Sequence, residues 1–104
     1  MTYQESLSAL SDPTRRIVFE AIAKQPSAVG DLAANMPVSR PAVSQHLKVL
    51  SDAGLVVSHA KGTKRIYRVR PEGLADLRKY LEQFWETALD AFANEIAKNE
   101  GGTE

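Results

Sequence analysis

Residues 39–54 contain polar and basic side chains of the kinds that bind DNA. In this stretch Val43, Leu47 and Leu50 recur at the i, i+4, i+7 spacing of one helical face, which predicts that this face packs on a core. Gln45 lies nearly opposite them, and amide, hydroxyl and guanidinium groups bind base edges and phosphates. We therefore predict a DNA-recognition helix. Its candidate contacts are Ser39, Arg40, Pro41, Ser44, Gln45, His46 and Lys48.

The ends of this helix carry residues that favour helix termini. Ser39 is the predicted N-cap, and Pro41 is tolerated because amides of the first turn have no partner within the helix. Gly54 is the predicted C-terminal stop. The positive N-terminal end of such a helix favours a phosphate. His46 lies at the edge of the apolar stripe, where it either contacts a phosphate or is half-buried and bonded to a neighbour.

Other chemistries find little support in the composition. The chain has no cysteine, which excludes disulfides, thiolate metal sites and cysteine nucleophiles. Its two histidines, His46 and His59, fall in different predicted elements, so we predict no metal site and no cofactor. Ser44 and His46 point in different directions on one helix, and we therefore predict no catalytic site and no enzyme activity.

Several elements are needed to hold the recognition helix. Helical spacing predicts a short helix at residues 3–10, a second capped by Asp12 and ended by Pro26, and a third capped by Ser27 and ended by Pro37. Two short helices joined by a tight turn form a helix-turn-helix. After Gly54, β-branched and aromatic residues flank a glycine-bearing turn at residues 61–64, which predicts a β-hairpin, or wing.

A long helix is predicted from Leu74 onward, with an apolar stripe across roughly seven turns. So small a domain cannot bury the whole stripe, so a second subunit is the simplest cover. An aromatic stripe of this kind also leaves open a small-ligand pocket. Leu81, Phe84, Trp85, Leu89 and Phe92 are the candidate dimerisation residues on this helix.

Charge is unevenly distributed along a chain whose formal net charge is zero. Residues 39–70 contain seven Lys and Arg and one acidic residue, whereas residues 71–104 contain three basic and eight acidic residues. A basic block beside an acidic one suggests one face for a polyanion and another turned away from it.

The sequence therefore predicts a mainly α fold with a β-hairpin. This winged helix-turn-helix has about five helices, a two-stranded wing and a long C-terminal helix for dimerisation. With 104 residues, a single domain over residues 1–98 and a frayed polar tail at 99–104 are expected. No apolar run is long enough to span a bilayer and the N-terminus lacks signal-peptide features, which predicts no membrane association and a cytoplasmic location.

Three stretches resemble the ArsR-type winged-helix transcriptional repressors. They are residues 9–16 (ALSDPTRR), 43–50 (VSQHLKVL) and 53–56 (AGLV). The resemblance implies homodimers paired through the first and last helices, which adds Leu7 to the dimerisation residues. It also implies recognition helices in major grooves and wings near flanking minor grooves. The implied wing contacts are Lys61, Thr63, Lys64 and Arg65.

The chain departs from the metal-sensing members of that family. Their cysteines would fall near residues 27–32, which read SAVGDL, and the predicted last helix has no histidine. The resemblance is therefore to a non-metal branch, with an unidentified small-molecule effector or none.

These observations predict a sequence-specific, homodimeric repressor of transcription that binds an inverted-repeat operator in double-stranded DNA. The alternative is a winged-helix interaction module whose basic hairpin binds an acidic protein partner.

Overall fold

Helix α4 (Arg40–Asp52) forms where the recognition helix was predicted. In the computed structural model, which describes residues 3–102 and the side chains of residues 3–99, Val43, Leu47 and Leu50 are fully buried. The Ser39 hydroxyl accepts a hydrogen bond from the Ala42 amide at 3.3 Å, so the predicted N-cap is confirmed. Gly54, with φ of 76°, lies just beyond the helix, as expected for a C-terminal stop.

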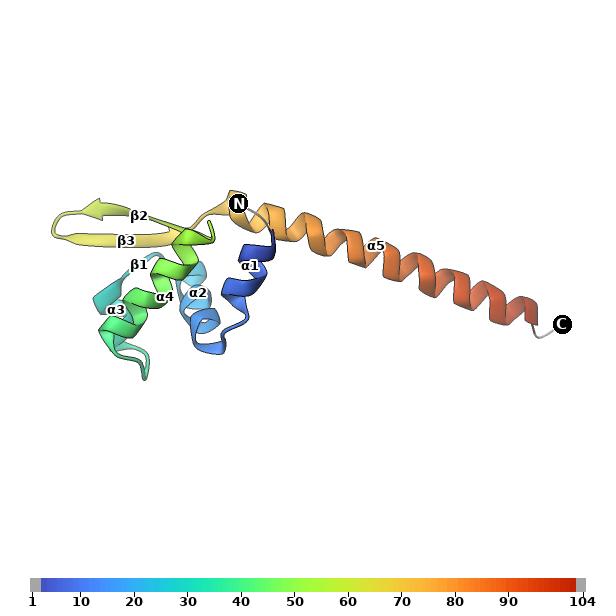
Figure 1. Cartoon of the computed structure of the whole chain (residues 1–104), viewed down its shortest axis with the longest axis horizontal. Helices are drawn as coiled ribbons and strands as arrows, with labels where there is room; N and C mark the ends of the chain where they lie inside the picture. The colour runs from blue at the N-terminus through green and yellow to red at the C-terminus, as the bar shows by residue number, and fades with distance from the viewer. Residues whose placement is uncertain (1–2, 103–104) are drawn as a thin grey trace.

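The other helices pack with α4 in one body, from which the hairpin and the last helix project in opposite directions (Figure 1). The remaining elements are α1 (Tyr3–Leu10), α2 (Pro13–Lys24), β1 (Ser27–Ala28), α3 (Val29–Ala34), β2 (Val56–Lys61), β3 (Lys64–Val69) and α5 (Pro71–Gly102). The hairpin β2–β3 extends from one end of the body and α5 from the other, so the longest dimension is 72 Å. The predicted mainly α winged fold is confirmed.

The core joins α2, α4 and the start of β2. Val18 and Ile22 of α2 belong to one buried cluster with the stripe of α4, and Leu55 and Val56 belong to the same cluster. Each fully buried aliphatic side chain contributes about 1.5–3 kcal/mol of hydrophobic free energy. This packing fixes which face of α4 points outward.

A third strand joins the wing, where the sequence predicted only two. Strand β1 pairs antiparallel with β3, with Ser27 opposite Tyr67 and Ala28 opposite Ile66. The expectation that Ser27 caps the third helix was therefore wrong. Ser27 lies in the strand and its hydroxyl donates to the carbonyl of Gln25, while Ala28 occupies the N-cap position of α3 with no side-chain bond.

Helix α5 begins at Pro71, three residues before the predicted start. Its first turn lies on the turn after α4, where a β-carbon on Gly73 would overlap the carbonyl oxygen of Gly54. The helix continues to Gly102, beyond the expected domain end at residue 98, and the last two residues of the expected tail lie outside the described part of the chain. Helix α1 packs on α5 within the chain: the rings of Tyr3 and Tyr80 stack with centroids 3.9 Å apart.

Candidate nucleic-acid interface

The outer face of α4 is open to solvent. Ser44, Gln45 and Lys48 are exposed on the side opposite the buried stripe, and Ser39, Arg40 and Pro41 are exposed at its N-terminal end. The packing of α4 on α2 therefore leaves a polar surface free to enter a groove.

His46 is half-buried at the edge of this face. Its Nδ1 atom is buried and no hydrogen-bond partner for it is present among the described residues. His46 is therefore half-buried, as one of the two sequence alternatives predicted. The hydrogen bond to a neighbour that this alternative included is absent among the described residues.

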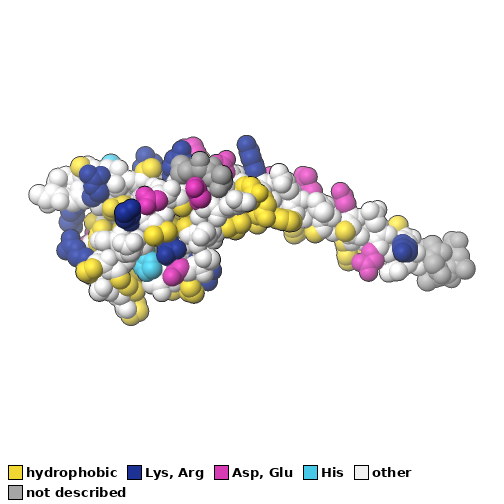
Figure 2. Space-filling model, in the orientation of Figure 1, with side chains coloured by type: hydrophobic (Ala, Val, Ile, Leu, Met, Phe, Trp, Pro, Cys, Tyr) yellow, Lys and Arg dark blue, Asp and Glu magenta, His cyan; other side chains and the backbone are white. Residues whose placement is uncertain are grey.

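A cleft between α3, the start of α4 and the wing brings several predicted DNA contacts together. It has a volume of about 350 Å³, and its walls include Arg40 from α4 and Thr63, Lys64 and Arg65 from the wing. Figure 2 shows Lys and Arg side chains gathered at the end of the body that carries the wing. Lys61 is exposed on the neighbouring strand, paired across the hairpin with Lys64. The sequence-predicted wing contacts thus adjoin the start of the recognition helix.

Three of the predicted contacts already have partners within the chain. The Nζ of Lys48 lies 2.9 Å from Oδ2 of Asp52, one turn along α4, and the Nζ of Lys64 lies 3.8 Å from Oδ2 of Asp31 on α3. In addition, Arg65 Nη1 donates to the Ser58 hydroxyl at 3.0 Å. Exposed pairs of this kind contribute only about 0.2–1 kcal/mol, so a DNA phosphate can replace them.

Sequence reasoning missed Asp31 and Ser58 as parts of this surface. Asp31 carried no signal, because its contact with Lys64 exists only once the hairpin has folded back toward α3. Ser58 could have been found, since alignment of the two predicted strands places it beside the basic strand β3.

Known proteins are similar in sequence to this part of the chain. The sequence model for bacterial regulatory proteins of the arsR family fits residues 12–58, which run from the cap of α2 into β2. The HTH-type transcriptional regulator Rv2034 of Mycobacterium tuberculosis is 54% identical over 88 residues, which are 85% of this chain and 82% of the relative. The chain belongs to the ArsR family.

Other relatives agree with this assignment. The transcriptional repressor SdpR of Bacillus subtilis is 32% identical to this ArsR-family protein over 76 residues, 73% of this chain and 84% of SdpR. One similar solved structure is the ArsR-like transcriptional regulator from Rhodococcus sp. RHA1. It superposes on this chain with a TM-score of 0.75 and 31% sequence identity, and the superposition covers 86% of this chain and 88% of the Rhodococcus chain. The winged helix-turn-helix is therefore this family's fold.

Charged side chains at the start of α2 make hydrogen bonds that hold this helix in the ArsR-family fold. The Arg15 amide donates to the carboxylate of Asp12 at 3.0 Å, and this bond holds the pKa of Asp12 below its ordinary value of 3.8. The guanidinium groups of Arg15 and Arg16 donate to the carbonyls of Ala9 and Leu10, each at 3.1 Å. These two bonds join α2 to the end of α1.

The apolar stripe of α5 is exposed beyond the first turns of the helix, where Leu77 is buried. Beyond Tyr80, every described side chain through Asn99 is exposed, and Trp85 and Phe92 are 66% and 61% exposed. Figure 2 shows hydrophobic side chains along one edge of α5 where it leaves the body. The other predicted dimerisation residues, Leu7, Leu81, Phe84 and Leu89, are also exposed.

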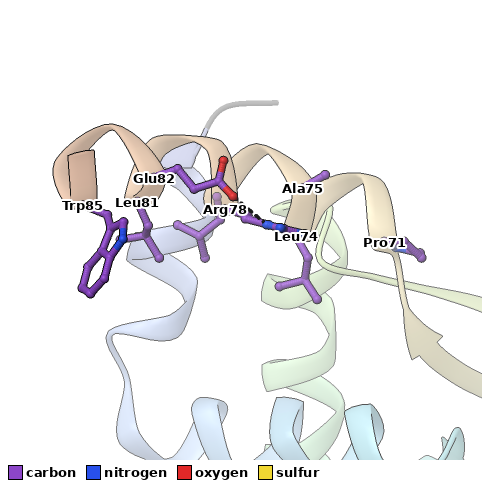
Figure 3. Close-up of a pocket in the computed structure, with 8 residues that line it drawn as sticks. Pro71, Leu74, Ala75, Arg78, Leu81, Glu82 and Trp85 are labelled. Carbon is purple, nitrogen blue, oxygen red and sulfur yellow. Dashed lines mark hydrogen bonds and ion pairs between the residues drawn. The ribbon is translucent and has the colours of Figure 1, made fainter. Parts of the chain in front are cut away.

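An open hollow of about 730 Å³ follows the first turns of α5. Leu74, Leu81 and Trp85 project from the same side of the helix, and Arg78 pairs with Glu82 at 2.8 Å on its rim (Figure 3). The exposed apolar side chains farther along α5 continue this surface, and a contiguous exposed apolar patch is typical of a protein interaction site. It marks the side of α5 on which a partner would fit.

Within residues 3–102, no group of three or more His, Asp or Glu residues is placed to hold a metal ion. The same part of the chain has no helix both long and apolar enough to cross a bilayer.

Proposed function

We propose that this protein is a homodimeric transcription repressor that binds double-stranded DNA at an inverted-repeat operator. The observation that carries the proposal is the exposed polar face of α4, held outward by three fully buried side chains and continuous with the basic cleft at the wing. Duplex DNA is the polyanion whose groove accepts a helix. The names of Rv2034 as a transcriptional regulator and SdpR as a transcriptional repressor support the same role.

The exposed residues divide into two roles. Gln45 and Arg40, at the middle and start of α4, are positioned to contact base edges in the major groove and to carry sequence preference. Lys48 and the wing residues Lys61, Lys64 and Arg65 hold phosphates, the wing ones near the flanking minor groove. Each phosphate neutralised by these cations makes binding weaker as salt rises.

The exposed stripe of α5, together with α1, is the proposed dimer interface. Burial of Trp85, Phe92 and their neighbours against a second copy would remove the apolar surface from water and place two α4 helices on one side of the dimer. A twofold arrangement requires half-sites about one helical turn, roughly 34 Å, apart. Such a dimer bound over a promoter excludes polymerase.

Three further features complete the proposal. The protein has no catalytic role, since its family consists of transcription regulators. It acts in the cytoplasm, where bacterial DNA is located. If the hollow along α5 stays open in the dimer, it is the proposed site for an unidentified small-molecule effector that changes DNA occupancy.

Selection of bound fragments from random and genomic DNA tests this function. We expect enrichment of an imperfect inverted repeat, and repetition with candidate effectors would show which of them reduce the enrichment. Recovery of fragments without a shared sequence would overturn the proposal and favour the alternative, in which the basic hairpin binds an acidic protein.

A further inference from the structure

The cleft between α3 and the wing contains a carboxylate among cations. Arg40, Lys64 and Arg65 line it with their positive charges, whereas Asp31 contributes the negative charge. The Asp31 carboxylate lies 3.8 Å from the Lys64 ammonium group. At this surface any DNA phosphate that approaches Lys64 meets Asp31 as well.

The pairing of β1 with β3 creates this contact. Ala28 lies opposite Ile66 in the sheet, so the first turn of α3, which contains Asp31, is held beside the strand that begins at Lys64. The side chains of Asp31 and Lys64 remain 63% and 62% exposed. An ion pair this open to water is weak and exchanges readily with another anion.

We propose that Asp31 holds Lys64 in the DNA-free protein, that a DNA phosphate takes its place in the complex, and that Asp31 thereby limits affinity for the phosphate backbone. Two effects act in the same direction. Binding must break the Asp31–Lys64 contact, and the released carboxylate then repels the phosphate. Because phosphates carry no sequence information, Asp31 weakens binding to every sequence alike. This inference rests on the proposed DNA-binding function.

The test measures binding of the full chain to a fluorescent duplex of random sequence by anisotropy at low salt. Asp31→Asn removes the charge at nearly constant shape, and an exposed pair of this kind corresponds to about two- to fivefold tighter binding when it is removed. Asp90→Asn, which makes the same change on the exposed face of α5, is the matched control and leaves affinity unchanged.

A double-mutant cycle shows whether Asp31 acts through Lys64. In a Lys64→Ala background, Asp31→Asn should have a much smaller effect than in the wild type. An equal effect in both backgrounds, or an equal gain from Asp90→Asn, would overturn the inference by reducing Asp31 to a general surface charge. If the wild type binds DNA but Asp31→Asn binds no more tightly, the inference about Asp31 is overturned and the proposed function is not. If the wild type binds no DNA at all, both are overturned.

A second measurement needs no DNA. Backbone amide relaxation of Thr63, Lys64 and Arg65 should show greater mobility in Asp31→Asn than in Asp90→Asn. Equal mobility in the two variants would contradict the contact itself.

Discussion

Asp12 is the residue whose local chemistry gives the clearest dependence on pH. Its folded pKa lies below 3.8, chiefly because it accepts the Arg15 amide bond, so the ionised carboxylate stabilises the folded state. This stabilisation is fully present above pH 3.8 and is lost as the pH falls through the lower, folded pKa. Asp12→Asn keeps a capping oxygen but no charge.

We therefore expect the wild type to melt above Asp12→Asn at neutral pH, with the difference shrinking as the solution is acidified below pH 3.8. Thermal unfolding followed by circular dichroism measures this. A difference that stays constant or widens in acid would contradict the assigned role.

Gln45 and Lys64 should separate sequence reading from phosphate binding. Both are exposed, one on α4 and one on the wing, so truncation leaves the core intact. Gln45→Ala should reduce the preference for a selected operator over random DNA by about 1–3 kcal/mol. Lys64→Ala should weaken both duplexes equally and reduce the salt slope by about one. Equal losses on both duplexes for both variants would defeat the division.

Among the elements, the start of α5 depends on the absence of a side chain. A β-carbon on Gly73 would overlap the Gly54 carbonyl. The backbones at Gly73 and Gly54 are both held by packing, so neither can readily move aside. Gly73→Ala should lower the free energy of unfolding by about 1–3 kcal/mol, as overpacking does. Gly30→Ala is the control, since the nearest atoms to a β-carbon there, in the Arg40 guanidinium, are 3.8 Å away and a helix position favours alanine. Denaturant titration compares them, and a Gly73→Ala variant as stable as Gly30→Ala would be inconsistent with the contact.

The elements also differ in how far the sequence determines them. α4 was predictable because its repeat, cap and terminal glycine are all local, and the wing because its two strands flank a glycine turn. Strand β1 was not, because two residues carry no alternation and pair only through contact with β3. The start of α5 was missed because Pro71 and Gly73 suggest a break, whereas Pro71 suits the first helical position and Gly73 serves packing.

The same distinction applies to the candidate site. The outward face of α4 follows from the period of its buried residues, so Gln45 and Lys48 could be placed from sequence. The cleft could not, because it joins α3, α4 and the wing. The contacts of Lys64 with Asp31 and of Arg16 with Leu10 likewise depend on tertiary packing rather than on spacing.

At the scale of the whole molecule, the projecting α5 predicts the state of assembly. Trp85→Gln and Phe92→Gln replace exposed aromatic side chains with a good helix former, so they leave the monomer folded. Each should raise the dimer dissociation constant by about tenfold or more, as for an aromatic interface anchor. Glu86→Gln, exposed on the same helix, should have little effect. Sedimentation equilibrium measures all three, and aromatic variants that dimerise as tightly as Glu86→Gln would place the interface elsewhere.

The number of chains on one duplex tests the central claim most directly. Sedimentation of the complex with a selected operator gives this number, because the masses of the chain and the duplex are known. Two chains bound together to one inverted repeat, with no single-chain complex at partial saturation, is the expected result. A saturated complex that contains one chain would contradict the account, since α4 would then read DNA without a twofold partner.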